Sequence, residues 1–272
     1  MDIIDLYEKL AEHGHAPAEG CTLFSVGYED AFRRLKQKYL VERFARGGSA
    51  EKFVVGPFGS GKTHFLRHLM EVAKELNCVV AEVALNKDVD FTKSLIVYQE
   101  VARELSTPGQ NGKGMRALLL GCLDQVKNMA PTKEDTEEFL SAWISGLDLA
   151  SFELDSFGFV ARRALEAHLE ENEGLFNTAC RWLSGEVTNR FIAKDLGLKT
   201  ISGAEQNLYA RRALFSVALL ARHAGFNGTV MCFDEAEQGL RVIPCMVVQS
   251  KGQLPLRRAR AELMVHLQLL LP

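Results

Sequence analysis

Residues 52–70 read KFVVGPFGSGKTHFLRHLM, and they carry the most informative pattern in the chain. The first few are apolar and β-prone, and those after the glycines place apolar side chains at helical spacing, at Phe65, Leu66, Leu69 and Met70. Between the two runs, Gly56 to Thr63 fit the pattern G-x-x-x-x-G-K-[ST]. The stretch therefore predicts a strand, a glycine-rich loop and a helix, in that order.

A loop of this kind binds the phosphates of a nucleotide. Its glycines let the backbone curl so that successive N–H groups point at phosphate oxygens, and the following helix adds its positive N-terminal end. Lys62 is expected to neutralise the β- and γ-phosphates, and the Thr63 hydroxyl is expected to ligate Mg²⁺. We predict that the loop residues that hold ATP are Gly56, Pro57, Phe58, Gly59, Ser60, Gly61, Lys62, Thr63 and His64.

The apolar run from Val230 to Phe233 ends in two carboxylates, Asp234 and Glu235. A buried strand would present both beside the phosphate loop, as a Walker B strand does. Asp234 would then hold Mg²⁺ through water, and Glu235 would be the catalytic base that orients and polarises the attacking water. The alternative interpretation is a strand that ends in an N-cap aspartate.

Three further groups are weaker candidates. Residues 86–89 (Asn86-Lys87-Asp88-Val89) depart from the guanine-reading pattern N-K-x-D at their last position, and they form either a nucleotide-proximal turn or a solvated one. His64 and His68, spaced i and i+4, are either packed or part of a metal site that lacks a visible third ligand. Four arginines are candidates for a positive charge supplied late in hydrolysis, namely Arg181, Arg211, Arg212 and Arg222.

The remaining pattern predicts an α/β fold. A second strand is expected at residues 78–85, helices from about 92 to 226, and a strand at 229–233 that follows a long helix at about 205–224. We therefore predict a parallel P-loop NTPase sheet in residues 51–91 and 227–272. A helical N-terminal region would occupy residues 1–50, and a large helical insertion would occupy residues 92–226, between the second strand and the Walker B strand.

The composition is that of an ordinary soluble globular protein: 272 residues, 47% hydrophobic and 25% charged, with a net charge of −3. No apolar run approaches the roughly 18 residues that a membrane helix needs, and the acidic start lacks the basic region of a signal peptide. We therefore expect a cytoplasmic protein that does not bind membranes. Six scattered cysteines are expected to be reduced structural thiols, and the negative charge gives no support to DNA binding, although it leaves room for a local basic patch.

Beyond these motifs, the chain resembles the P-loop ATPases of the AAA+ kind, and more narrowly the ATP-binding proteins of bacterial BREX (bacteriophage exclusion) systems. The similar segments are Gly27-Tyr28, residues 56–67, Cys180 to Glu186, Ala221 to Phe226 and Asp234 to Glu237. The resemblance implies an ATPase in phage defence that forms a homo-oligomer and acts with protein partners in a defence or remodelling complex, including DNA-modifying ones.

The C-terminal part departs from that pattern. An ATPase of this class continues with a parallel strand that carries a polar sensor residue and then with a helical lid, whereas here 37 residues follow Glu235. Residues 242–248 are β-prone, and residues 256–271 fit either an altered C-terminus or an amphipathic surface helix. Residues 241–272 carry five basic side chains and one acidic one. We expect a C-terminally incomplete core.

These observations predict a Mg²⁺-dependent ATPase that couples hydrolysis to a conformational change in a protein or DNA partner. The alternative is a nucleotide-gated binding module with little or no hydrolysis. A small-molecule P-loop kinase is disfavoured, because no acceptor site is recognisable.

Overall fold

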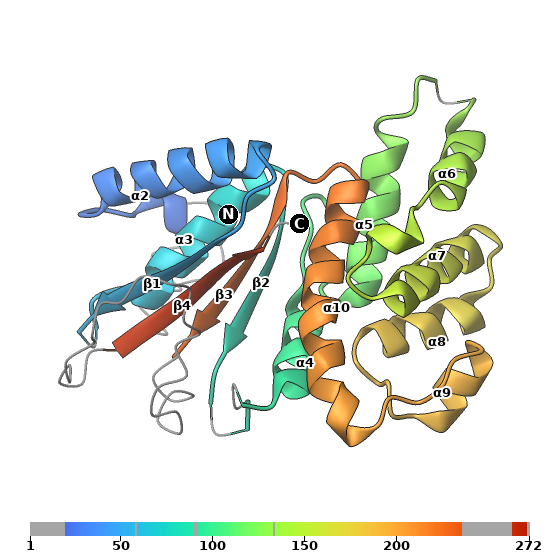
Figure 1. The fold of residues 1–272 in the computed structure, drawn as a ribbon. Helices are drawn as coiled ribbons and strands as arrows, with labels where there is room; N and C mark the ends of the chain where they lie inside the picture. The colour runs from blue at the N-terminus through green and yellow to red at the C-terminus, as the bar shows by residue number, and fades with distance from the viewer. Residues whose placement is uncertain are drawn as a thin grey trace.

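The computed structural model describes residues 20–57, 59–86, 88–89, 92–132 and 134–235, together with the backbone of 263–270. Its centre is a sheet of strands β1 (Ala50–Gly56), β2 (Cys78–Ala84), β3 (Gly228–Asp234) and β4 (Leu263–Leu270) in the order β1-β4-β3-β2 (Figure 1). β2 and β3 are parallel, as predicted. β4 was expected neither as a strand nor between β1 and β3.

β4 makes the sheet mixed, because it runs antiparallel to both of its neighbours. The backbone pairs Ala50↔Leu269 to Gly56↔Leu263 on one side and Thr229↔Leu270 to Phe233↔His266 on the other. The surface-helix interpretation of residues 256–271 is therefore wrong for 263–270. Since β1 and β3 are both antiparallel to β4, they run in the same direction and end at the same edge of the sheet.

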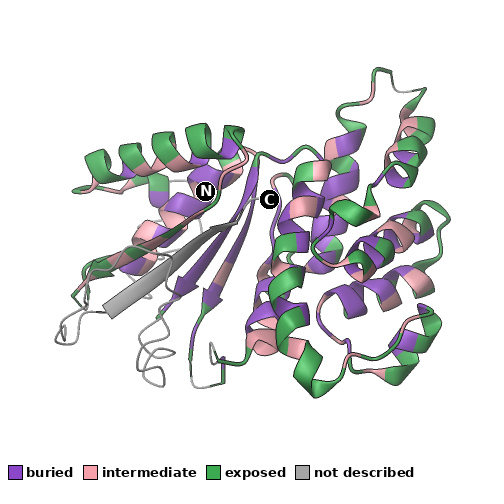
Figure 2. Cartoon of the chain, in the orientation of Figure 1, coloured by how far each residue is buried: buried purple, intermediate pink, exposed green. Residues whose placement is uncertain are grey.

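The two faces of β2 and β3 belong to different hydrophobic cores. Val79, Ala81 and Val83 of β2 pack with the helices on one face, while Cys78 and Val80 pack with those on the other. β3 alternates in the same way, and all seven of its residues are buried. These strands are almost wholly apolar because, as in other parallel sheets, helices cover both sides (Figure 2).

One face is covered by α3 (Lys62–Glu75) and by the segment that precedes β1. That segment contains the short helix η1 (Cys21–Leu23), α2 (Glu29–Leu35) and the π-helical continuation η2 (Lys36–Arg43). The sequence predicted a helical region here, but it did not predict the π-helical stretch. The buried residues Phe32, Leu40 and Phe44 are separated by multiples of four, so a turn wider than that of an α-helix keeps them on one side.

The other face is covered by helices that lie between β2 and β3 in the sequence. They are α4 (Ser94–Glu104), α5 (Met115–Lys127), α6 (Thr136–Ser145), η3 (Leu149–Ser151), α7 (Asp155–Leu169), α8 (Glu173–Leu183), α9 (Arg190–Asp195) and α10 (Gly203–His223). α4 contacts β2 and α10 contacts β3, and the other helices pack beyond these two (Figure 1). The division into domains stays a prediction, since one continuous core runs from the sheet into these helices.

The helices in the described part of the chain include none that is both long and apolar enough to cross a membrane. Residues 1–19 and 236–262 lie outside the described residues; they hold the start of the expected helical N-terminal region and the β-prone run at 242–248.

A substitution at Gly228, the first residue of β3, would test how tightly the N-terminal segment packs on the sheet. A Cβ atom added at Gly228 would lie 2.3 Å from two ring carbons of Phe44. We therefore expect Gly228→Ala to lower the free energy of unfolding by about 1–3 kcal/mol, because the buried ring must shift. Urea denaturation would measure this change.

Gly203→Ala is the matched control, because a Cβ at this first residue of α10 would meet nothing within 4 Å. It should leave stability unchanged or slightly raised. Equal stability of Gly228→Ala and the unmodified chain would contradict the packing of Phe44 on β3.

Candidate functional site

The phosphate loop joins the end of β1 to the start of α3. Gly59 and Gly61 have positive φ angles of 75° and 83°, a region that residues with a Cβ rarely adopt. Gly61 is the residue before α3, so the free N–H groups of the first turn of that helix face the loop. Phe58, one of the predicted loop residues, lies outside the described residues.

Lys62 lies over the loop rather than in solvent. Its Nζ donates hydrogen bonds to the carbonyl oxygens of Gly56, at 3.1 Å, and Pro57, at 2.8 Å. The side chain is only 8% exposed. An ammonium group has three donors, so one remains for a further acceptor such as a phosphate oxygen.

Thr63 and Asp234 meet across the site, although they are far apart in the sequence. The Thr63 hydroxyl donates to Asp234 Oδ2 at 2.6 Å, and Asp234 Oδ1 accepts the backbone N–H of Glu235 at 2.8 Å. Asp234 is 8% exposed. A hydroxyl oxygen beside a carboxylate is the ligand chemistry that Mg²⁺ prefers, so the two side chains predicted as metal ligands fit that ion.

Glu235 has an unusual backbone for the residue predicted as catalytic base. Its φ angle is 54°, in the left-handed region, where a residue other than glycine is strained by about 1–3 kcal/mol. The side chain is exposed at the end of β3, directly after Asp234. No local pattern in the sequence predicted this backbone conformation.

The ion pair between Arg67 and Glu82 was also missed. Arg67 lies one turn after Thr63 on α3, and its Nε donates to Oε1 of Glu82 on β2 at 3.1 Å. Both side chains are 25% exposed. A single carboxylate inside the apolar run of β2 was the signal in the sequence, because a half-buried charge needs a partner.

His64 and His68 are packed by the N-terminal segment. Ser25 Oγ lies 2.8 Å from His64 Nε2, and the Tyr28 hydroxyl lies 3.1 Å from His68 Nδ1. The ring of Phe32 stacks on that of His68 at 4.0 Å. No cluster of three metal-ligating side chains occurs among the described residues, so the contacts favour the packing interpretation.

The turn after β2 lies at the same edge of the sheet as Asp234, because the two strands are parallel and in register. Asn86 Oδ1 accepts the backbone N–H groups of Asp88, at 2.8 Å, and Val89, at 3.0 Å. Lys87 lies outside the described residues. The side-chain oxygen of Asn86 therefore stabilises the turn itself, which favours a structural role for this side chain.

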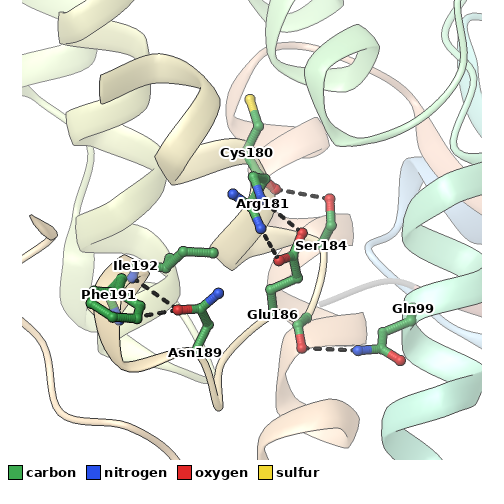
Figure 3. Close-up of polar contacts among 9 residues, drawn as sticks. Gln99, Cys180, Arg181, Ser184, Glu186, Asn189, Phe191 and Ile192 are labelled. Carbon is green, nitrogen blue, oxygen red and sulfur yellow. Dashed lines mark hydrogen bonds and ion pairs between the residues drawn. The ribbon is translucent and has the colours of Figure 1, made fainter. Parts of the chain in front are cut away.

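The four candidate arginines differ in their surroundings. Arg181 donates to both oxygens of Glu186, at 3.0 and 2.6 Å, beside the contact between Gln99 and the Gly185 carbonyl at 3.0 Å (Figure 3). The Arg181 guanidinium thus links the last turn of α8 to the residues that follow this helix. Arg222 donates to the Phe44 carbonyl at 3.5 Å, and Arg211 and Arg212 are exposed on α10. Within the described part of the chain, none of these contacts involves the phosphate loop.

The cysteines of the described region are all buried free thiols, namely Cys21, Cys78, Cys122, Cys180 and Cys232. Burial raises the pKa of Cys21, Cys78 and Cys180 to about 12, so the reactive thiolate is scarce at neutral pH. The expectation of structural thiols is therefore supported for these five. Cys245 lies outside the described residues.

The histidine packing makes stability depend on pH. Burial lowers the pKa of both His64 and His68, although Glu71 opposes the shift. Below the unfolded pKa of about 6.5, the unfolded state binds more protons than the folded state, so stability is lost as the pH falls. We expect the free energy of unfolding to decrease between pH 7.5 and pH 5.5.

The double variant His64→Gln/His68→Gln should lose less stability over the same interval, because it lacks the two groups. Denaturation at several pH values gives the slope of unfolding free energy against pH for the variant and for the unmodified chain. The contributions of the other titrating groups are common to both proteins and cancel in the difference. Parallel pH profiles of the two proteins would show that these histidines do not carry the effect.

Comparison with known proteins identifies the family. The family model described as BREX system ATP-binding protein BrxC/D matches residues 5–249. No curated protein and no solved structure matches the chain significantly. The matched range includes the phosphate loop, β3 and both carboxylates that follow it. Because the match covers most of the 272 residues, the chain belongs to the family of BREX (bacteriophage exclusion) ATP-binding proteins.

Proposed function

We propose that this BREX ATP-binding protein hydrolyses ATP with Mg²⁺ and uses the reaction to change the conformation of a partner. The observation that carries the proposal is the 2.6 Å hydrogen bond between Thr63 and Asp234. It unites a hydroxyl from the phosphate loop with a carboxylate from a distant strand, as a nucleotide–Mg²⁺ site requires.

In this proposal the loop binds the triphosphate, and Lys62 supplies the main positive charge. The Lys62 ammonium exchanges one or both of its loop carbonyl acceptors for β- and γ-phosphate oxygens. The loop residues other than Pro57, which has no N–H, add backbone N–H groups around the phosphates. Mg²⁺ neutralises the phosphate charge when it is bound, with Thr63 and Asp234 as the residues that would hold it.

Glu235 is the proposed general base. Its exposed side chain comes directly after Asp234 in the sequence, and this proximity supports a role in accepting a proton from a water molecule that attacks the γ-phosphate. The strained backbone at this residue is a cost that such a role would explain. Leu85 N donates to the Asp234 carbonyl at 3.0 Å, which ties this end of β3 to the chain that leaves β2.

The alternative is a nucleotide-gated binding module with little hydrolysis. It is favoured by the surroundings of the four candidate arginines, since none of them contacts the phosphate loop in the described part of the chain. A positive charge from a neighbouring subunit or partner would restore hydrolysis. The proposed setting is a cytoplasmic phage-defence complex that includes protein partners, with the chain as a homo-oligomer.

Nucleotide binding and turnover should be measured separately, on the unmodified chain and on Lys62→Ala and Glu235→Gln. We expect Lys62→Ala to lose ATP binding. Glu235→Gln should keep ATP binding and lose turnover by about 10²-fold or more, because the amide cannot accept a proton.

Thr63 offers a matched pair of variants. Thr63→Ser keeps the hydroxyl and should retain Mg²⁺-dependent ATP affinity, whereas Thr63→Val has a similar shape without the hydroxyl and should lose it. ATP binding without turnover in the unmodified chain, unchanged by Glu235→Gln, would establish the gated module instead. Absence of ATP binding in the unmodified chain would overturn the proposed site.

A further inference from the structure

A strongly basic surface lies on the helix formed by α2 and η2. Residues 33–46 contain six basic side chains and one acidic one, Glu42, which gives a net charge of +5 in a chain whose total is −3. The basic residues are Arg33, Arg34, Lys36, Lys38, Arg43 and Arg46. Lys52 of β1 adds a further positive charge next to η2. We call this set the basic face.

The basic face is exposed to solvent, and the opposite side of its helix is buried. The apolar side of the helix is buried through Phe32, Leu40 and Phe44 in the core that also contains α3. All the cations of the basic face except Lys36 and Lys52 are exposed. Figure 2 shows the outer side of α2 and its continuation as exposed along most of its length.

The described residues neutralise little of this charge. Arg34, Lys38 and Arg46 pair with no carboxylate of a described residue. Arg33 pairs with Asp30 at 3.0 Å, but both side chains are at least 75% exposed, so the pair is weak. The one acidic residue, Glu42, accepts a hydrogen bond from Gln37.

Two of the cations lie close to the ring of Tyr39. Lys52 Nζ lies 4.7 Å and Lys38 Nζ 5.9 Å from the centre of its ring. The pKa of Tyr39 is lowered, first by a hydrogen bond with Lys52 and then by the charges of Lys52, Lys38 and Arg43. Cations from two elements, β1 and η2, therefore stabilise negative charge at one place on the surface.

We propose that the basic face binds the phosphate backbone of duplex DNA. At the rise of an α-helix, the stretch from Arg33 to Arg46 extends about 20 Å. Six cations over that length are about 4 Å apart on average, which is comparable with the spacing of about 3.4 Å per phosphate along one strand of a duplex. The cations can therefore meet successive phosphates of one strand.

The composition of the face favours nucleic acid over an acidic protein. The cores of protein interfaces are rich in aromatic side chains and poor in charged ones, whereas protein–DNA interfaces are polar and strongly positive. Val41 is the exposed large apolar side chain within 33–46. Contacts to phosphates carry no sequence information, so the binding is independent of DNA sequence. It is also independent of ATP hydrolysis.

The test is the salt dependence of binding to a fluorescent duplex of mixed sequence, with the full chain and its variant Arg34→Gln/Lys38→Gln. Both residues are exposed, and glutamine keeps the helix propensity. We expect the slope of log affinity against log salt to become shallower by about 2, because two phosphate contacts are lost. Affinity at low salt should fall by about tenfold, while ATP binding stays unchanged.

Lys194→Gln/Lys199→Gln is the matched control, since it removes the same charge from two exposed lysines at α9 and just after it. It should leave DNA affinity and slope unchanged. An equal loss in the control, or no salt-dependent binding by the unmodified chain, would overturn the proposal. Polyglutamate or anionic vesicles that bind as tightly as DNA, with the same loss in the Arg34/Lys38 variant, would assign the face to an acidic protein or a membrane instead.

Discussion

The parallel pairing of β2 with β3 is the constraint on which the rest of the structure depends. It joins Cys78 to Gly228 at one end and Ala84 to Asp234 at the other. Because the strands are in register, the chain that leaves β2 and the carboxylates that end β3 meet at one edge of the sheet. Because β2 and β3 are parallel, the chain between them must return to the end of the sheet at which β2 begins, and α4 to α10 all form within this connection.

Two polar contacts join α3 to this pair of strands. Thr63 donates to Asp234 of β3, and one turn later Arg67 donates to Glu82 of β2. Charged groups in a largely apolar sheet are costly unless they are paired, so each contact offsets the burial of its own carboxylate. Together they fix the rotation of α3 about its axis, and this rotation sets where the phosphate loop lies relative to Asp234.

The sequence predicted correctly those elements that depend on a local pattern of residues. The strand, loop and helix around residues 52–70 follow from an apolar run, glycines and helical spacing, and the structure places elements there at β1 and α3. The contact between Thr63 and Asp234 also agrees with expectation, because two strands of a parallel sheet bring their C-terminal ends together. Residues 230–233 are wholly apolar and every residue of β3 is buried, as expected for a strand covered on both faces.

Features that depend on distant pairing were not predictable in the same way. The position of β4 between β1 and β3 is set by which edges pair, and no local pattern encodes it. The partner of Glu82 and the left-handed backbone of Glu235 likewise depend on the assembled site. The basic charges at 33–46 were visible in the sequence, but only the burial of Phe32 and Phe44 shows which side of the helix faces solvent.

The segment before α2 packs against α3, the helix that begins at the phosphate loop. Glu71 of α3 accepts the backbone N–H groups of Cys21 and Thr22, both at 2.9 Å. Ser25 donates to the Cys21 carbonyl and therefore accepts from His64, which places the His64 proton on Nε2 and leaves the buried Nδ1 without a donor among the described residues. An unsatisfied buried polar atom costs about 1–3 kcal/mol. Because His64 directly follows Thr63 on α3, a change in the phosphate loop that brought a donor to Nδ1 would recover that free energy.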